Sequence, residues 1–256
     1  MDYGLYVSAA GMKAQLARQD VVANNLANAQ TTGFKRDLTL MQSRANAVNE
    51  DPTMFQYRAP VLEDMGGGMY ASGAGIDLSQ SLLESTGNQT DLALDGKGFF
   101  TVQGDNGQKL LTRDGRFLLD NQGNLVTATG GRKVLDANGQ PITLNPDLPV
   151  VVGSDGMVTQ DDAGGSGVQL GLANVSDSRK LVKLGGNVMA ASNSDDLANA
   201  PSETKVLQGH LEASGTDPVV ELVNMMEGQR AFDANAKMIS YQDTTLSQVN
   251  TIGRVA

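Results

Sequence analysis

The sequence predicts an α+β fold, with N- and C-terminal helices pairing as a coiled-coil-like α domain and a central, mostly antiparallel β domain. Apolar side chains recur at helical spacing in residues 1–34 and 218–250. Between these ends, short runs of apolar and β-branched residues alternate with Asn-Gly and Asp-Gly turns, which indicate hairpins. A lone amphipathic helix cannot bury its apolar stripe, so the two ends must pair with each other or with other copies of the chain.

The N-terminal helix is predicted within residues 1–36. Its apolar residues follow the alternating spacing of a coiled-coil seam, with Gln19 as a polar break. The seam consists of Leu5, Ala9, Met12, Leu16, Ala23 and Leu26. We expect Thr31-Thr32-Gly33 to end the helix, with Gly33 as a left-handed cap.

Residues 37–86 are predicted to form an extended connector with β segments. A helical pattern continues over residues 37–48 until Pro52 would end it. Residues 53–64 alternate imperfectly and are expected to be extended chain. The partial two-residue alternation of residues 76–82 predicts a strand.

Residues 87–205 are predicted to form the β domain, because turn signals separate short strand-like runs throughout this range. The turns are Asp105-Asn106-Gly107, Asp114-Gly115, Gln122-Gly123-Asn124, Asn138-Gly139 and Asp155-Gly156. The expected strands are 98–103, 109–112, 116–120, 125–127, 150–152 and 169–175. Residues 188–205 are rich in Asn, Ser, Ala and Asp and are expected to be a loop.

Residues 206–256 are predicted to contain a return connector and the C-terminal helix. Pro218 suits the first helical position, Thr216 or Asp217 can act as N-cap, and Glu221 favours the positive end of the helix dipole. The expected seam consists of Leu222, Met225, Phe232, Ala236, Ile239 and Leu246, with Gln229, Asp243 and Asn250 in its polar positions.

The composition excludes several classes of protein. The chain has 256 residues, 19 basic and 29 acidic, and a net charge of −10, which argues against a nucleic-acid partner. Because it contains no cysteine, it forms no disulfide. No segment reaches the ~18 apolar residues of a membrane span, so we expect no membrane insertion. The N-terminus lacks the basic and then apolar pattern of a cleaved signal peptide.

No arrangement of residues in the sequence predicts catalysis or a cofactor. Aspartates beside Gly or Asn would suit calcium, but no stretch has the spacing of a calcium loop, and turn geometry explains them. Gly96-Lys97-Gly98 lacks the spacing of a phosphate-binding loop. His210 is the only histidine, and no nucleophile elbow accompanies it. We therefore expect no catalytic residue, no metal and no cofactor.

Motifs along nearly the whole chain resemble those of flagellar rod and hook proteins. Near the N-terminus they are Leu5-Tyr6, Ala9-Ala10-Gly11-Met12, Val22-Ala23-Asn24-Asn25-Leu26-Ala27-Asn28 and Thr32-Gly33-Phe34-Lys35-Arg36. In the middle they are Thr86-Gly87-Asn88, Asp91-Leu92-Ala93-Leu94-Asp95-Gly96, Gly98-Phe99-Phe100 and Thr112-Arg113-Asp114-Gly115 with Phe117. Near the C-terminus they are Leu211-Glu212-Ala213-Ser214, Val220-Glu221-Leu222-Val223 and Gln229-Arg230-Ala231-Phe232.

This resemblance implies a structural subunit of the bacterial flagellar basal-body rod, not an enzyme. It implies polymerisation through the terminal helices into a helical tube that transmits motor torque to the hook. Its partners would be copies of itself, other rod proteins and the flagellar type III export apparatus, and its location the periplasmic rod. The opening residues Met1-Asp2-Tyr3-Gly4-Leu5-Tyr6 and the closing residues Ile252-Gly253-Arg254-Val255 most resemble those of proximal rod proteins. Distal rod proteins are the close alternative.

The residues expected to pack between subunits come from the two terminal segments. They are Leu5, Met12, Leu16, Asn24, Asn25, Leu26, Asn28, Gly33, Phe34, Leu222, Met225, Gln229, Arg230, Phe232, Ile239 and Leu246. Two other functions remain open from the sequence. One is a secreted β-domain enzyme or ligand-binding module, which would need His210 and acidic residues to converge. The other is a cap or scaffold that binds the rod transiently.

Overall fold

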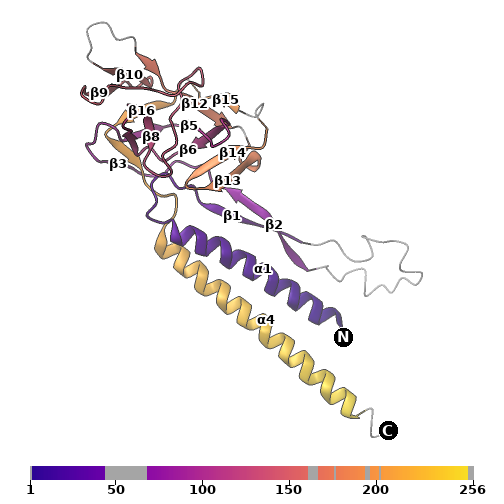
Figure 1. Ribbon diagram of the computed structural model, residues 1–256. Helices are drawn as coiled ribbons and strands as arrows, with labels where there is room; N and C mark the ends of the chain where they lie inside the picture. The colour runs from indigo at the N-terminus through magenta and orange to yellow at the C-terminus, as the bar shows by residue number, and fades with distance from the viewer. Residues whose placement is uncertain are drawn as a thin grey trace. The chain divides into compact units, whose positions relative to one another are not determined.

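A computed structural model describes residues 2–43, 68–160, 167–175, 177–193, 197–201 and 203–252 (Figure 1). The chain forms two compact units. The helix unit comprises Met1–Ala27, Asp37–Gly75 and Pro218–Ala256, and the β unit comprises Asn28–Arg36 and Ile76–Asp217. Both are built from segments far apart in the sequence, so each depends on long-range contacts.

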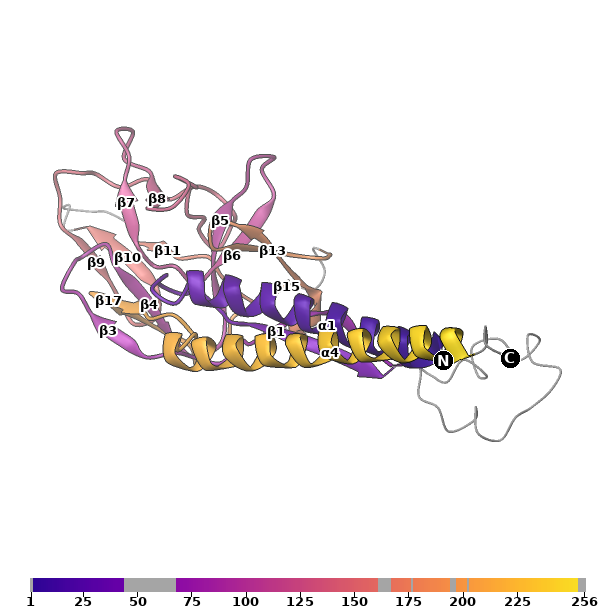
Figure 2. The ribbon, with the colours of Figure 1, turned by 90° about the horizontal axis from the view of Figure 1, so that it is seen from below.

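The helix unit is centred on two helices that lie side by side in both views (Figures 1 and 2). Helix α1 spans Asp2–Ala27 and helix α4 spans Pro218–Ile252. They run antiparallel, because residues early in α1 meet residues late in α4. Pro218 occupies the first position of α4, as the sequence predicted. The paired terminal helices and the antiparallel strands between them confirm the predicted α+β fold.

Helix α1 ends earlier than predicted. Its last residue is Ala27, whereas Gly33 has the expected left-handed backbone with a φ of 66° but lies beyond the helix. Beyond Ala27 the Thr31 N–H donates to the Asn28 carbonyl oxygen at 3.0 Å, so a local turn takes the place of a further helical turn. Asn25, in the last turn of α1, holds the strand that follows, because its buried amide donates to the carbonyl oxygen of Asp37 and accepts from the Asp37 N–H, both at 2.9 Å.

Residues 37–43, predicted to continue the helix, instead form strand β1 (Asp37–Ser43). This strand pairs with β2 (Met69–Ile76) and packs against α1. The alternation of exposed and half-buried side chains along β1 is that of a strand, which the helical interpretation overlooked. The rest of the predicted helix and the extended chain of residues 53–64 lie outside the described residues.

The strand predicted over residues 76–82 is wrong, because β2 ends at Ile76. The Ser79 N–H donates to the Asp77 carboxylate at 3.0 Å, and this local turn replaces the strand. A short strand, β3 (Leu83–Ser85), follows and pairs with β17 (His210–Glu212).

The main sheet of the β unit has six antiparallel strands in the order β13-β14-β6-β5-β12-β15. In the same order, their bounds are Leu181–Gly185, Val188–Ala191, Lys109–Thr112, Phe99–Gln103, Leu172–Val175 and Leu197–Asn199. A short 3-10 helix, η1 (Ser178–Lys180), precedes β13. Smaller sheets pair β4 (Leu92–Asp95) with β16 (Lys205–Gln208), β7 (Phe117–Leu119) with β8 (Leu125–Thr127), and β10 (Met157–Gln160) with both β9 (Val150–Val152) and β11 (Val168–Gln169). Strands β14 to β16 show that the loop predicted over residues 188–205 is wrong in part.

Four turns of the β unit share one backbone geometry. Gly107, Gly123, Gly139 and Gly156 each have a φ between 75° and 82°, and each donates its N–H to the carbonyl three residues earlier. Three of these turns connect the paired strands β5–β6, β7–β8 and β9–β10. The predicted turns at these four positions are therefore confirmed, and three of them are hairpin turns.

The core of the β unit consists of two apolar clusters. The larger includes Phe100 and Phe117, whose rings pack edge to face with centroids 5.1 Å apart. The smaller includes Phe99, Leu111 and Met189 on the main sheet. Among the described residues, no helix is long and apolar enough to cross a membrane.

Candidate functional site

The seam between α1 and α4 is made of glycines that face amide side chains. A Cβ placed on Gly11 would lie 3.1 Å from Asn235 Nδ2, and one on Gly228 would lie 3.5 Å from Gln19 Cγ. Gly4 faces Gln242 in the same way, at 2.6 Å from its Nε2. Glycine lets the two backbones approach closely, and the longer polar side chain of the opposite helix fills the space.

Three leucines of the apolar seam predicted from the sequence are largely exposed in the single chain. Leu5, Leu16 and Leu222 are 39%, 47% and 48% exposed, so a large part of each side chain faces away from the rest of the chain. Others of the predicted seam, Met12 and Phe232 among them, are half-buried. The glycines that face amide side chains are therefore one part of the helix pairing, at the places where the opposite helix comes close.

Large apolar side chains remain exposed along the helix unit, and we call this set the apolar flanks. They are Leu5, Tyr6, Leu16, Leu38, Leu40, Met69, Tyr70, Val219, Val220, Leu222, Val223, Met226, Met238, Tyr241 and Val249. Clusters of exposed apolar residues on this scale mark interaction surfaces more often than free surface.

The remaining predicted assembly residues fall into three groups. Asn24 donates to the Asp37 carboxylate at 2.9 Å, so both it and Asn25 act within the helix unit. Gln229 and Arg230 are exposed on α4, whereas Leu26, Met225, Ile239 and Leu246 are half-buried. Asn28, Gly33 and Phe34 belong to the segment 28–36 of the β unit, which we call the strap.

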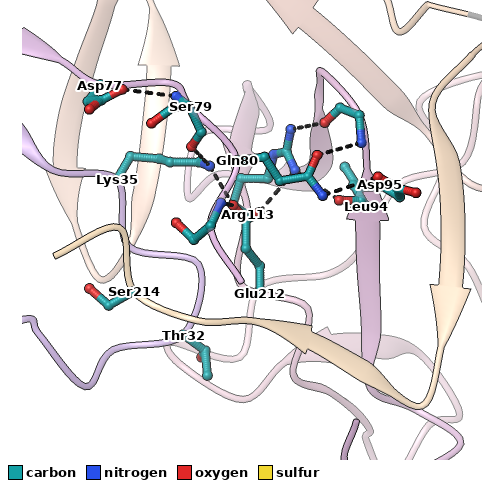
Figure 3. Close-up of polar contacts among 12 residues, drawn as sticks. Thr32, Lys35, Asp77, Ser79, Gln80, Leu94, Asp95, Arg113, Glu212 and Ser214 are labelled. Carbon is teal, nitrogen blue, oxygen red and sulfur yellow. Dashed lines mark hydrogen bonds and ion pairs between the residues drawn. The ribbon is translucent and has the colours of Figure 1, made fainter. Parts of the chain in front are cut away.

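The strap carries a fully buried charged group, Lys35. Lys35 and Arg113 converge on the carboxylate of Glu212 (Figure 3), with Lys35 Nζ 2.6 Å from Oε1 and an Arg113 guanidinium nitrogen 3.0 Å from Oε2. The three side chains are 1–3% exposed. The ammonium also donates to the Ser79 carbonyl oxygen at 2.7 Å, and the Ser81 N–H donates to Glu212 Oε1 at 2.9 Å. We call Lys35, Arg113 and Glu212 the ion cluster.

Burial dominates the electrostatics of this cluster. Desolvation lowers the pKa of Lys35 below its ordinary 10.5, although the Glu212 carboxylate acts in the opposite direction. Desolvation likewise lowers the pKa of Arg113 despite the same carboxylate, yet a guanidinium stays protonated in proteins. The cluster therefore holds two cations around one anion, an excess positive charge that polar groups must compensate.

Arg113 is fixed from the body of the β unit. Its guanidinium donates to the carbonyl oxygens of Leu94, at 3.2 Å, and Gly96, at 2.6 Å, and it lies 5.4 Å from the centroid of the Phe99 ring. These contacts place Arg113 beside Glu212 without any help from the strap, although the Arg113 Nε is buried with no hydrogen-bond partner among the described residues.

Sequence reasoning missed both the glycine seam and the ion cluster. In α1 the glycines of the seam lie seven residues apart, at Gly4 and Gly11, and this period was available as a signal. The members of the ion cluster are up to 177 residues apart, so no local pattern could pair them. A hint was that each lies in one of the motifs that carried the family resemblance.

His210 does not organise a site. It lies half-exposed in β17, and its ring Nδ1 is 2.9 Å from the Gln208 carbonyl oxygen. Its partner across the strand pair is Ser85. In the part of the chain that the structure describes, no group of three or more potential metal ligands gathers.

Comparison with known proteins agrees with the motifs. Residues 5–35 match the family described as flagella basal body rod protein, residues 93–160 the flagellar hook protein FlgE/F/G D1 domain, and residues 207–252 the flagellar basal body rod FlgEFG protein C-terminal family. The chain is 36% identical over 260 residues to the flagellar basal-body rod protein FlgF of Caulobacter vibrioides, covering all of both chains. It belongs to the flagellar basal-body rod protein family.

Other relatives include proteins named FlgF and proteins named FlgG. The FlgG of Bacillus subtilis is 33% identical over 98% of both chains, and the FlgF of Mesorhizobium japonicum is 30% identical over 99% of both. Proteins of this family are structural parts of the basal-body rod, not enzymes, and they assemble with copies of themselves and with other rod proteins. Each stretch matched by a family contains one member of the ion cluster: Lys35, Arg113 or Glu212.

Proposed function

We propose that this rod protein polymerises through its terminal helices into a helical tube that carries motor torque to the hook. The observation that supports this most is the position of the apolar flanks. In one chain the glycine–amide seam joins α1 to α4, while Leu16, Leu222 and Met226 stay about half exposed. Burying such side chains against another copy is favourable by roughly 1.5–3 kcal/mol for each one fully buried.

The glycine–amide seam also supports assembly, because it is a weak contact on its own. The side-chain oxygens of Gln15 and Gln242 are buried without a hydrogen-bond partner among the described residues. Unsatisfied buried polar atoms of this kind reduce stability. A helix pair held by such a seam gains from neighbours that cover its flanks, and contacts that do not close into a ring generate a helical filament.

Two substitutions with equal starting exposure test this proposal. Met226 on α4 and Val151 on β9 are both 54% exposed, so Met226→Asp and Val151→Asp each add one charge to an exposed apolar position. We expect Met226→Asp to reduce incorporation into purified basal bodies and to impair swimming, whereas Val151→Asp leaves both near the parent level. Equal incorporation of the two variants would contradict assembly through the helices.

We propose that the flagellar type III export apparatus carries this protein out of the cytoplasm, and that the protein is then incorporated into the periplasmic rod. We divide the chain by role: residues 1–36 and 206–256 contribute the assembly helices, residues 37–86 connect, and residues 87–205 form the outer β domain. Export is measured separately from assembly, by the amount of protein outside the cytoplasm in cells that lack a completed rod.

Within the rod, we propose the proximal position of FlgF. The opening residues Met1-Asp2-Tyr3-Gly4-Leu5-Tyr6 resemble proximal rod proteins, and the 36% identity to the Caulobacter vibrioides FlgF supports the same position. The alternative is the distal position, which the 33% identity to a FlgG supports. Imaging of purified basal bodies that carry a label on this chain decides between the two positions along the rod.

A further inference from the structure

The strap is held on the β unit mainly by polar contacts. Gly33 donates its N–H to the Glu212 carbonyl at 2.7 Å, and the Gly215 N–H donates to the Phe34 carbonyl at 2.8 Å. Phe34 is buried, but among the described residues neither apolar cluster of the β unit includes a strap residue. The strap also contributes no strand to any sheet described. Segments with few apolar contacts of this kind open more readily than the core they cover.

Lys35 differs from the other strap contacts because it carries a full charge into the interior. Its ammonium has one anionic acceptor within bonding distance, Glu212 Oε1 at 2.6 Å, and one neutral acceptor, the Ser79 carbonyl oxygen at 2.7 Å. The other charged groups that act on it are Arg113, which repels it, and Asp77, which attracts it. Asp77 itself lies 3.6 Å from Arg36 in an ion pair.

Glu212 does not need Lys35 to be paired. Without the strap, Glu212 and Arg113 still form a neutral pair, and the carbonyl oxygens of Leu94 and Gly96 hold the guanidinium in place. Lys35, in contrast, would bring an unpaired charge into a buried position if Glu212 were missing. Burying an unpaired ammonium is costly, and removing its proton near neutral pH is costly as well, so without Glu212 the docked strap is disfavoured either way.

We propose that Lys35 makes closure of the strap conditional, so that the strap docks on the β unit only when Glu212 is in place to accept its ammonium. Strap and acceptor are separated by 177 residues. Because a chain is synthesised from its N-terminus, the strap exists well before its acceptor. An incomplete chain therefore keeps the strap open, and closure follows the arrival of the segment that ends β17.

Hydrogen exchange in the purified full-length chain tests whether closure of the strap depends on Glu212. Glu212→Gln keeps the shape of the acceptor and removes its charge. We expect peptides that cover the strap to exchange at least about tenfold faster in this variant, as when a buried ion pair loses one partner. Amides of the β5–β6 hairpin should change less than about twofold, and trypsin should cut faster after Lys35 and Arg36.

A second substitution separates conditional closure from a simple loss of stability. Lys35→Met in the Glu212→Gln background leaves Arg113 in the same state but removes the ammonium that needs a partner. We expect this double variant to recover strap protection to within about twofold of the parent. Asp105→Asn, which breaks the exposed ion pair with Arg132, is the control and should change nothing in the strap.

Two results would overturn the proposal. One is a double variant whose strap exchanges as fast as that of Glu212→Gln alone, since the buried ammonium would then not be the cause of opening. The other is equal acceleration in the strap and in the β5–β6 hairpin of Glu212→Gln, since the ion cluster would then stabilise the whole unit without controlling the strap.

Discussion

Gly11 of α1 faces Asn235 of α4 so closely that a Cβ on Gly11 would lie 3.1 Å from the Asn235 amide nitrogen. Seven residues earlier in α1, Gly4 meets Gln242, which lies seven residues later in α4. Glycine and amide therefore repeat in the same register along the helix pair. A polar residue at a repeated position of a helix pair fixes register at some cost in stability.

Gly11→Leu should disrupt this register. The new side chain cannot fit against Asn235, and we expect a loss of about 1–3 kcal/mol, the usual cost of overpacking. Far-UV circular dichroism during thermal unfolding of the full chain measures the effect. Lys13→Leu adds the same side chain at an exposed position of α1 and should leave the unfolding transition in place. Equal transitions for the two variants would show that the seam does not set the pairing.

Gly33→Ala should destabilise the β unit for two reasons that a control can separate. Its φ of 66° costs a residue with a Cβ roughly 1–2 kcal/mol, and the added Cβ would overlap the backbone of Arg113. Gly131 has a φ of 59° and open space around its Cβ position, so Gly131→Ala carries the backbone cost alone. In urea unfolding, Gly33→Ala should lose clearly more free energy than Gly131→Ala. Similar losses would mean that the strap moves away without penalty.

Local chemistry explains what the sequence could predict. The turns at Gly107, Gly123 and Gly139 were predictable because an Asn or Asp near a glycine favours this geometry wherever the flanking residues can pair. The start of α4 was predictable for a similar reason, since proline suits the first helical position. The hairpin turn predicted at Asp114-Gly115 is wrong, because β6 and β7 on either side of it belong to different sheets. Gly115 instead allows a close approach, since a Cβ there would overlap the Leu92 carbonyl oxygen.

The sequence could not predict which residues contact one another across long distances in the chain. An apolar stripe indicates that a helix buries one face, but it does not say against what, so Leu5 and Leu222 were assigned to the contact that Gly4 and Gly11 make. The ion cluster was missed for the same reason at longer range. Arg113 and Glu212 are 99 residues apart, and only the fold brings their charges together.

Asp177 should titrate at unusually low pH. Hydrogen bonds from the Arg179 side chain and its backbone N–H lower the pKa of Asp177 to about 2. We expect Arg179→Ala to raise this pKa toward the ordinary 3.8, because the guanidinium contributes the largest effect. NMR titration of the carboxyl carbon measures the midpoint. Arg132→Ala, which removes the partner of Asp105, should leave the midpoint of Asp177 unchanged; an unchanged midpoint in Arg179→Ala would contradict the assignment.

The ion cluster should make stability rise at alkaline pH. The pKa of Lys35 in the folded chain lies below 10.5, so between these values the unfolded chain binds a proton that the folded chain lacks. The free energy of unfolding therefore increases with pH across that window, and below it the buried ammonium carries a constant penalty. Lys35→Met removes the titrating group, so the parent should gain stability relative to this variant as pH approaches 10.5.

Urea unfolding at a series of pH values measures the difference in the free energy of unfolding between the parent and Lys35→Met. Contributions from titrating groups that both chains share cancel in this difference. Lys109→Met removes an exposed amine from the same unit and serves as the control. At neutral pH, Lys35→Met should be as stable as the parent or more so, because Glu212 keeps Arg113 as its partner and the cost of burying the ammonium disappears. A parent that instead loses stability relative to Lys35→Met as pH rises would show that attraction to Glu212 outweighs desolvation of Lys35.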